Sequence, residues 1–406
     1  MSRRRWTAPG GLWGLGRTTA ELAAGRRRWQ ALMEQAVPTL MEQGAPTRKA
    51  ARVRPSAPRD EGASRSRRLR EIRAFGPNPG RLRCLAYAPA TLPRRAPLVV
   101  ALHGCTQTAH DYDRGTGWST LAERHGFAVL LPEQRKENNS HVCFNWFEPG
   151  HTSRDAGEVA SIREMIRHLV AERGIDPRRI YVTGLSAGAA MAGALLATYP
   201  ELFAGGALIA GLPFGAAGSV SEAFHAMFNG RELDAKAWGA LVREAAPTPS
   251  EWPSVSVWHG TADRTVSPVN AEASVRQWLQ VHGLAGSPPA EHARSGLRRR
   301  VWRDAGGKVR VEEVLIDGMG HGAPVSGEIG RVGRFFPDHG VSSTLQIAQG
   351  WGLTGREVVT AVAQDPEPAG PPSSPAGAQA RAEEREPQGS IADTIQSALR
   401  TAGLLR

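Results

Sequence analysis

A serine between two glycines marks the part of this sequence where chemistry is most strongly indicated. The residues from Gly184 to Gly188 read GLSAG, after the apolar run 180–183 and before a small-residue, helix-like run, 187–199. Such a strand-to-helix turn is typical of a nucleophile elbow, which exposes the serine hydroxyl at the edge of a sheet. Glycine is expected on both sides because the tight turn brings the helix backbone close to the strand. The segment predicts Ser186 as a nucleophile, the alternative being a turn that serves only close packing.

A serine hydroxyl ionises far above neutral pH, so it needs a base to remove its proton and a carboxylate to orient that base. The first candidate for the carboxylate is Asp263, on a loop directly after the apolar strand-like run 254–258. The alternative for Asp263 is a turn-forming role beside Gly260 and Thr261. Asp317 is the second candidate, but it adjoins the strand that precedes the candidate histidine and is expected to be a turn residue.

The candidate base is His321, one of 12 histidines, in the segment GMGHG after a strand-like run that ends at Ile316. Glycines around a histidine let a loop bring the imidazole to the serine without steric conflict. A single histidine is usually structural, but this one completes the chain order Ser186, Asp263, His321, which is the order of the α/β-hydrolase fold. The three residues predict the catalytic triad of a serine hydrolase.

Two backbone N–H groups are expected to hold the oxyanion that forms when a serine attacks a carbonyl. One should belong to Ala187, where the N-terminus of the predicted helix also favours negative charge. The other should come from the loop HGCTQ after the run 97–102, with Cys105 as first choice and Thr106 as second. Cys105 is not itself expected to be a nucleophile, because it lacks an elbow.

Strand-like and helix-like runs alternate around these candidates, which is typical of a mostly parallel sheet covered by helices on both faces. The predicted fold class is therefore α/β, with an α/β-hydrolase fold. Residues 212–252 interrupt the alternation and could be either a cap over the site or a helical excursion. The strand-like runs are 82–88, 97–102, 127–131, 180–183, 206–210, 254–258 and 309–316, and the helix-like runs are 118–125, 158–172 and 187–199.

Charge divides the chain into three parts. Residues 1–73 carry 17 basic and 6 acidic residues, which accounts for the whole formal net charge of +11. We expect a basic, largely disordered extension over 1–72 that could hold a helix at 18–36, a catalytic domain over 73–363, and a disordered tail over 364–406 that could end in a helix. The arm could bind an anionic surface, but no nucleic-acid-binding module accompanies it, so nucleic acid is not an expected partner.

Cysteine content and apolar run length bear on the compartment. No run reaches the roughly 18 apolar residues of a membrane span, so no transmembrane segment is expected. Cys84, Cys105 and Cys143 are too few for a disulfide scaffold and wrongly spaced for zinc, and neither metal nor cofactor is predicted. A bridge between Cys105 and Cys143 is left open and would imply an oxidising compartment. No clear signal peptide is recognised, which favours the cytoplasm, with export as the alternative.

Six segments together resemble the polyhydroxybutyrate (PHB) depolymerase-type esterases, α/β-hydrolases related to feruloyl and acetylxylan esterases. The resemblance implies an esterase with Ser186 as nucleophile, Asp263 as acid, His321 as base and the HGC loop at the oxyanion. It also suggests that Asn145, Trp146 and Phe147 lie near the substrate, a core position for the two aromatic residues being the alternative. The resemblance extends from Leu82 to Leu353, over LVVALHGCTQTAHDYDRGTGW, VCFNWFEPGHTSRDAGEVASI, RIYVTGLSAGAAMA, SVWHGTADRTVSPVNA, GMGHGAPV and GVSSTLQIAQGWGL.

The expected function is serine-dependent hydrolysis of carboxylic esters through an acyl-enzyme. The first expected substrates are short polyhydroxyalkanoate chains such as 3-hydroxybutyrate oligomers, and the alternatives are feruloyl or acetylxylan esters. A hypothesis of another class is a protein that binds a polyester granule or anionic surface through its basic arm. Secreted members that degrade polymer usually carry a signal peptide and a separate substrate-binding domain, and neither is recognised in this sequence.

Overall fold

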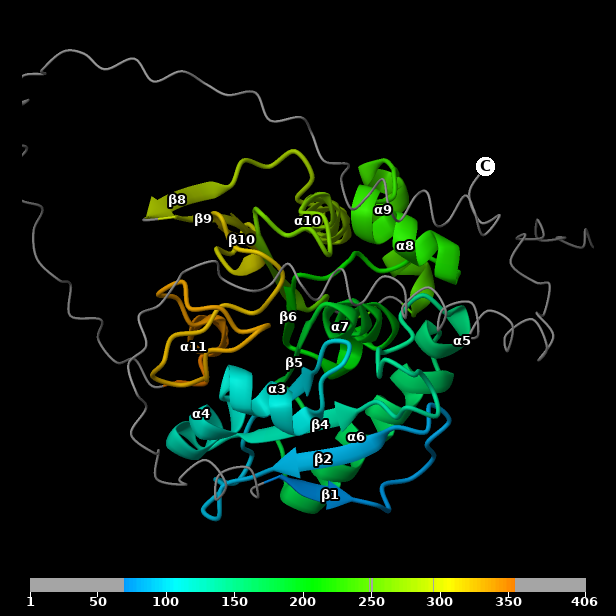
Figure 1. Cartoon of the computed structure of the whole chain (residues 1–406), viewed down its shortest axis with the longest axis vertical. Coiled ribbons are helices and arrows are strands. Elements are labelled where there is room, and N and C mark those ends of the chain that lie inside the picture. Colours follow the sequence, from blue (N-terminus) through cyan, green and yellow to red (C-terminus); the bar gives the residue numbers. More distant parts are fainter. Residues whose placement is uncertain (1–68, 248, 250, 295, 355–406) are drawn as a thin grey trace, which may run out of the picture.

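One ten-stranded sheet organises the described part of the chain, which comprises residues 69–247, 249, 251–294 and 296–354 of a computed structural model. The strand order is β1-β2-β4-β3-β5-β6-β7-β10-β9-β8, and Figure 1 shows it running from β1 at the bottom to β8 at the top. The strands are β1 (Arg70–Ile72), β2 (Arg83–Tyr87), β3 (Leu98–Leu102), β4 (Ala128–Glu133), β5 (Ile180–Leu185), β6 (Gly205–Ile209), β7 (Ser254–Gly260), β8 (Ala290–Arg294), β9 (Leu297–Arg303) and β10 (Val309–Ile316).

The six central strands, from β4 across to β10, are parallel neighbours, and antiparallel strands flank them at both edges. Most of their sequences are short apolar runs, and all five residues of β3 are buried, whereas β10 (VRVEEVLI) also carries charged residues. This composition follows from the covering of both faces of a parallel sheet by helices. The carboxyl ends of parallel strands meet at one edge of the sheet, so the loops after β3, β5, β7 and β10 open onto a common edge.

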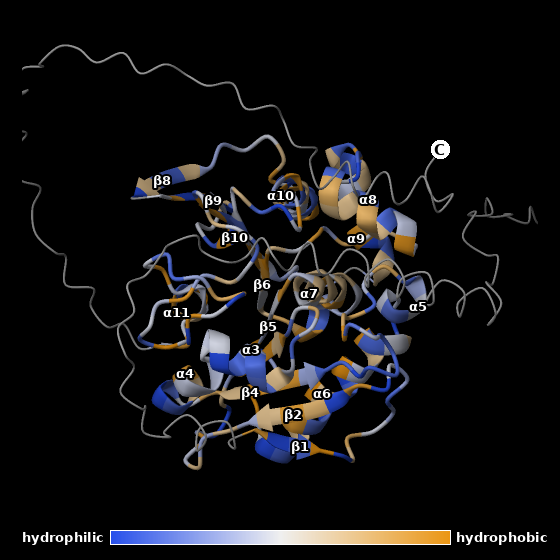
Figure 2. Ribbon diagram, in the orientation of Figure 1, coloured by the Kyte–Doolittle hydropathy of each residue, from blue (hydrophilic) through white to orange (hydrophobic). Residues whose placement is uncertain are grey.

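Helices cover both faces of this sheet (Figure 1), with α6, α7 and α10 on one face and α3, α4 and α11 on the other. Each face has its own apolar core. Figure 2 shows α7 in the apolar part of the colour scale, and all twelve of its residues are buried. The helices are α3 (Ala109–Thr116), α4 (Trp118–His125), α5 (Pro149–Thr152), α6 (Gly157–Arg173), α7 (Ala187–Thr198), the 3-10 helix η2 (Pro200–Leu202), α8 (Val220–Asn229), α9 (Ala235–Ala245), α10 (Val269–Val281) and α11 (Ser343–Gly350).

The predicted α/β-hydrolase fold is confirmed. Each predicted strand-like run overlaps a strand, and the predicted helices correspond to α4, α6 and α7. The hairpin of β8 and β9 was not predicted, because all five residues of β8 are exposed and its sequence, AEHAR, has no apolar alternation. Strand β1 pairs with β2 and so extends the sheet three residues upstream of the domain start expected at Arg73.

The segment 212–252 forms α8 and α9. Helix α9 packs against α10, and the buried rings of Phe224 and Trp238 lie in the same core as α7 and α10. The side chain of Gln277 on α10 donates to the carbonyl groups of Phe214 and Trp238 and accepts from the Phe214 N–H. The segment therefore belongs to the helical layer on this face of the sheet, as the helical-excursion alternative expected.

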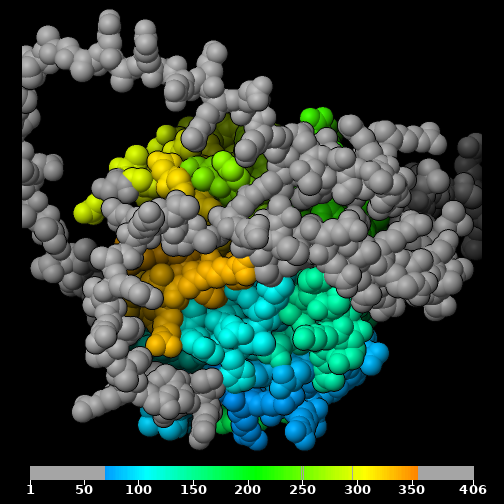
Figure 3. All heavy atoms as spheres, in the orientation of Figure 1, coloured from blue at the N-terminus to red at the C-terminus, as the bar shows by residue number. Residues whose placement is uncertain are grey.

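The chain after β10 returns across the other face to α3. In Figure 3 this gold-to-orange segment lies directly against the cyan segment that contains α3 and α4. A Cβ at Gly115 would lie 2.2 Å from the ring of Phe336, so the two segments approach closely. The helices expected at 18–36 and at the C-terminus fall outside the described residues. None of the described helices is both long and apolar enough to cross a lipid bilayer.

Candidate active site

The strand-to-helix turn at Ser186 has the tight geometry that its glycines predict. Ser186 has φ 58° and ψ −119°, a conformation that non-glycine residues rarely adopt. A Cβ at Gly184 would lie 2.4 Å from the backbone of Gly188, and a Cβ at Gly188 would lie 2.3 Å from the carbonyl oxygen of Leu102. Glycine is therefore required on both sides of the serine, and the N-terminus of α7 is brought against the end of β3.

Asp263 and His321 are 58 residues apart in the sequence and are joined by a hydrogen bond. His321 Nδ1 lies 2.7 Å from Asp263 Oδ2. The Asp263 side chain is completely buried, whereas that of His321 is 12% exposed. Because Nδ1 faces the carboxylate, Nε2 is the ring nitrogen left to face a serine. Among the described residues no hydrogen bond joins His321 to Ser186, and such contacts are often long until a substrate binds.

Hydrogen bonds surround the Asp263 carboxylate. Oδ1 accepts from the backbone N–H groups of Thr265 at 2.8 Å and Val266 at 2.9 Å. Oδ2 lies 3.4 Å from Nε2 of the buried His259, which also donates to the Val266 carbonyl at 2.9 Å. Burial raises the pKa of Asp263, but the charge of His321 and hydrogen bonds from His259 and His321 outweigh it, so the net pKa is well below its usual range. This aspartate is thus held as an anion.

The second carboxylate candidate, Asp317, has a different environment. Its side chain is exposed, and it lines an open surface depression of about 470 Å³ beside the β8–β9 hairpin. Asp317 lies in a turn after β10, and its backbone N–H donates to the Gly296 carbonyl at 2.8 Å, which continues the antiparallel pairing of β9 and β10 by one residue. The structure therefore brings Asp263, and not Asp317, to the imidazole of His321.

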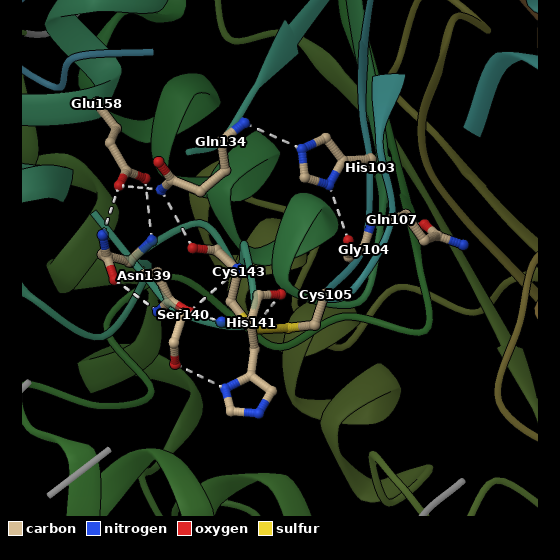
Figure 4. The surroundings of a disulfide bond; sticks show 11 residues. His103, Gly104, Cys105, Gln107, Gln134, Asn139, Ser140, His141, Cys143 and Glu158 are labelled. Carbon is tan, nitrogen blue, oxygen red and sulfur yellow. Dashed lines mark hydrogen bonds between the residues drawn. A yellow bond between two sulfur atoms is a disulfide. The ribbon is translucent and has the colours of Figure 1, made fainter. Parts of the chain in front are cut away.

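The loop after β3 is fixed from several sides, and Figure 4 shows the disulfide among these contacts. Cys105 forms a disulfide with Cys143, the one bridge that the sequence left open. The N–H of Thr106 donates to the His141 carbonyl at 2.7 Å, so this group is already engaged. Because the Thr106 amide is engaged, Cys105 stays the first choice for this oxyanion donor. Ala187, the other predicted donor, is the first residue of α7, where a backbone N–H has no partner within the helix.

A buried histidine supports the same loop. His103 Nε2 accepts from the backbone N–H of Gln134 at 3.1 Å, so Nδ1 carries the proton and donates to the Gly104 carbonyl at 2.8 Å. Burial lowers the pKa of His103, which keeps the ring neutral in this arrangement. The Gly104 N–H donates to Gln107 Oε1 at 2.8 Å. Both polar groups of Gly104 are therefore satisfied on the residue before Cys105.

The residues expected near the substrate lie in the interior. Asn145 is 2% exposed, and its side chain donates to Glu158 and accepts from Asn139. Trp146 is 8% exposed and packs edge-on against Phe147, which is also buried. These positions favour the core alternative for the two aromatic residues, and a substrate contact by Asn145 or Trp146 stays a prediction.

Several residues of this site were not predicted. Gln134, Glu158 and His259 support it, and so does His103, for which no role of its own was predicted although it begins the HGCTQ loop. Gln134 lies 31 residues from His103 and 24 from Glu158, so only the folded arrangement reveals these contacts, whereas His259 lies four residues before Asp263. No group of three or more His, Cys, Asp or Glu side chains within residues 69–354, as far as these are described, is arranged to hold a metal ion.

Comparison with known proteins places this geometry in a family. The model of the family described as "Esterase PHB depolymerase" matches residues 83–301. Poly(3-hydroxyalkanoate) depolymerase C of Paucimonas lemoignei is 43% identical over 293 residues, which cover 71% of this chain and 70% of the relative. Feruloyl esterase B of Talaromyces stipitatus is 30% identical over 265 residues, covering 63% of this chain and 72% of the relative.

Two acetylxylan esterases extend this comparison. The enzyme of Coprinopsis cinerea is 31% identical over 268 residues, covering 64% of this chain and 70% of the relative. The solved structure of the acetyl xylan esterase of Aspergillus awamori superposes with a TM-score of 0.61 at 24% identity, covering 70% of this chain and 99% of that one. Because the identity is only 24%, the superposition is evidence for the fold alone.

Proposed function

This chain belongs to the PHB depolymerase family of esterases, and on that premise we propose that Ser186, Asp263 and His321 are its catalytic triad. Membership makes the protein a serine carboxylic ester hydrolase. The observation that carries the assignment of the triad is the 2.7 Å hydrogen bond between His321 Nδ1 and Asp263 Oδ2, on loops that follow neighbouring strands β10 and β7.

The proposed reaction has two halves. His321 Nε2 takes the proton of Ser186 as Oγ attacks the ester carbonyl, and Asp263 stabilises the imidazolium. The N–H groups of Cys105 and Ala187 hold the oxyanion. When the tetrahedral intermediate collapses, the alcohol leaves with the proton from His321 and an acyl-enzyme remains. A water molecule, deprotonated by His321, then attacks the acyl group, and a second collapse releases the acid as His321 returns the proton to Ser186 Oγ.

The first proposed substrates are esters of 3-hydroxybutyrate in short polyhydroxyalkanoate chains. The support is the identity to the Paucimonas lemoignei depolymerase, 43%, compared with 30% and 31% to the feruloyl and acetylxylan esterases. Feruloyl and acetylxylan esters remain the alternative, because pocket shape rather than fold determines which ester binds.

The test is release of soluble 3-hydroxybutyrate from amorphous PHB, beside release of ferulate from a feruloylated sugar, by the wild type and by Ser186→Ala. We expect hydroxybutyrate release that the substitution abolishes without a change in the circular dichroism spectrum. Serine-dependent release of ferulate alone would move the substrate to the plant-wall esters, and activity retained by Ser186→Ala would exclude the triad.

The disulfide bears on where the protein works. Cystines persist mainly in oxidising compartments, so the Cys105–Cys143 bridge supports export over the cytoplasmic location favoured from the sequence. We propose the exported alternative, and the redox state of the two cysteines in protein isolated from the native cell would test it.

Binding of a polyester granule or anionic surface is a separate proposal, because the basic arm lies outside the described residues. A deletion of residues 1–68 would remove the arm and leave β1, which begins at Arg70. Ser186→Ala would be made both in the full chain and in the deletion variant. Sedimentation would then compare how much of each protein adsorbs to PHB granules. Reduced adsorption of the deletion variant is the expected result, and equal adsorption would remove the arm from the account.

A further inference from the structure

A fully buried carboxylate lies beside the oxyanion loop and has no part in the proposed reaction. Glu158, in the first turn of α6, has a side chain that is 0% exposed. Its Oε1 accepts from Gln134 Nε2 at 2.6 Å and from Asn145 Nδ2 at 2.7 Å, and its Oε2 accepts from the Asn145 N–H at 2.9 Å. His151 Nδ1 lies 3.4 Å from Oε1. A carboxylate is costly to bury even when it is paired, which suggests a use beyond stability.

One chain of hydrogen bonds leads from Glu158 to the residue before Cys105. Figure 4 shows Gln134 between Glu158 and His103. The Gln134 side chain donates to Glu158, its backbone N–H donates to His103 Nε2, and His103 Nδ1 donates to the Gly104 carbonyl. Each group in this series of hydrogen bonds acts either as donor or as acceptor. A shift of the Glu158 carboxylate would therefore shift the loop that contains Gly104.

A second chain leads to the other half of the disulfide. The second hydrogen of Gln134 Nε2 is donated to the Cys143 carbonyl at 3.1 Å. Asn145, held by Glu158, accepts from Asn139 Nδ2 at 3.0 Å, and Asn139 Oδ1 accepts from the Cys143 N–H at 3.3 Å. Glu158 therefore restrains the backbone on both sides of the Cys105–Cys143 bridge.

The bridged loops need such restraint. Thr106 has φ 63° and Val142 has φ 48°, and both are β-branched residues, for which positive φ is a rare and strained conformation. Strained residues persist where the surrounding structure fixes them, and they concentrate at functional sites. Thr106 and Val142 directly follow and precede the two bridged cysteines, so relaxation of either would move the Cys105 N–H.

We propose that Glu158 is a positioning residue that fixes the Cys105 N–H for the oxyanion, through Gln134 on one side of the disulfide and Asn145 on the other. The inference rests on the proposed role of Cys105 as an oxyanion donor. An oxyanion donor acts on charge that develops only in the transition state, so its misplacement lowers kcat and leaves KM nearly unchanged.

The first test is steady-state hydrolysis of p-nitrophenyl butyrate at pH 8 by Glu158→Gln. The glutamine amide has nearly the same volume as the carboxylate. Its NH₂ group faces one of the three donors from which the carboxylate accepts hydrogen bonds, and this loosens the network. We expect kcat to fall roughly 10- to 100-fold, less than the 10²- to 10³-fold typical of removal of a whole donor, with KM within about threefold of the wild type. Glu313→Gln is the matched control, because Glu313 is also buried but pairs with Arg300 on β9. It should leave kcat unchanged.

The second readout separates positioning from general destabilisation. A thionoester replaces the carbonyl oxygen with sulfur, a poor acceptor, so the oxyanion donors contribute less to its hydrolysis. The ratio of kcat for the oxygen ester to kcat for the thionoester should therefore fall in Glu158→Gln. A merely structural defect would lower both rates by the same factor and leave this ratio at the wild-type value.

The inference is overturned if Glu158→Gln keeps kcat within twofold of the wild type, or if the ratio of the two esters is unchanged. If Glu158→Gln does not fold, Asn139→Ala takes its place, because it keeps the carboxylate but removes the hydrogen bond from the Cys143 N–H, and the same criteria apply. Ser186→Ala is assayed in parallel. Activity retained by that variant would overturn the proposed function, whereas its loss together with a normal Glu158→Gln would overturn only the positioning role.

Discussion

At the scale of single residues, the candidate site depends on a tight elbow around Ser186 and on the buried carboxylate of Asp263. Ser186 has φ 58°, and the glycines on both sides have no space for a Cβ. Asp263 is held as an anion inside the protein by two histidines and two backbone N–H groups. The elbow fixes the hydroxyl and the buried carboxylate fixes the imidazole, so both partners are positioned before a substrate binds.

The tight elbow predicts that a single methyl group added at Gly188 destabilises the protein. In Gly188→Ala the new Cβ would lie 2.3 Å from the Leu102 carbonyl oxygen, a backbone atom that cannot move aside easily. We expect a loss of about 1–3 kcal/mol in the free energy of unfolding, as in other overpacked sites, and a lower kcat. Urea denaturation and steady-state kinetics would measure the two effects.

Gly193→Ala on the same helix is the control for this prediction. A Cβ at Gly193 meets only Leu208, at 3.9 Å, which is ordinary contact. Alanine is favoured over glycine within a helix by about 1 kcal/mol, so this variant should be at least as stable as the wild type. Equal effects of the two substitutions would show that close approach is not what requires Gly188.

The residues of the triad could be predicted from the sequence, whereas those that support them could not. Ser186, Asp263 and His321 each follow an apolar strand-like run and have glycines nearby, so local sequence marks them. Glu158 was predicted only as the first residue of the helix-like run 158–172. Its partners Gln134 and Asn145 are 24 and 13 residues away, and no spacing rule connects buried amides of this kind to a carboxylate.

At the scale of elements, strands and helices marked by apolar runs or by helical spacing of apolar residues were predicted, whereas the β8–β9 hairpin, which carries neither signal in β8, was not. Helix α7 is apolar throughout, and β3 and β5 are completely buried. Strand β8 has no apolar side because both of its faces are exposed, so it is stabilised by pairing with β9 rather than by burial. The strand forms because its residues pair with β9, and such pairing leaves no periodic pattern of apolar residues in the sequence.

The disulfide connects two of these elements, the loop after β3 and the segment after β4. In Cys143→Ser, loss of a cross-link spanning 38 residues should lower the free energy of unfolding by about 4 kcal/mol in the chain-entropy account. Urea denaturation of the wild type and the variant would measure the difference.

Thiol titration provides the control for the disulfide. The wild type unfolded without reductant should react with one equivalent of a thiol reagent, since Cys84 is the free cysteine and is buried in the native state. After reduction, three equivalents should react, because the sequence contains three cysteines. Three equivalents without reductant would show that the bridge is not formed in solution.

At the scale of the whole molecule, the free energy of unfolding should depend on pH through the buried carboxylate of Glu158. Burial raises the pKa of Glu158 to about 7, against hydrogen bonds from Asn145 and Gln134 that favour the charged form. The folded protein therefore holds this proton more tightly than the unfolded chain, whose pKa is near 4.5. The contribution of Glu158 to the free energy of unfolding should fall as pH rises from about 4.5 to about 7, by about 3 kcal/mol at 1.36 kcal/mol per unit.

The measurement is the free energy of unfolding of the wild type and Glu158→Gln at intervals from pH 4 to pH 8. Subtracting the two curves removes the titration of groups that both proteins share. The wild type should lose stability relative to the variant as pH rises through this window. A constant difference would mean that Glu158 has the same pKa in the folded and unfolded states.

The central claim, that Ser186 is the nucleophile of an ester hydrolase, is tested most directly by covalent labelling. A fluorophosphonate is attacked by an activated serine and leaves a stable adduct in place of the acyl group. Incubation of the whole chain with the reagent, followed by peptide mass spectrometry, should place one phosphonyl group on Ser186 as ester hydrolysis is lost, and Ser186→Ala should remain unlabelled. A phosphonyl group on another residue, or full ester hydrolysis after complete labelling of Ser186, would contradict the account.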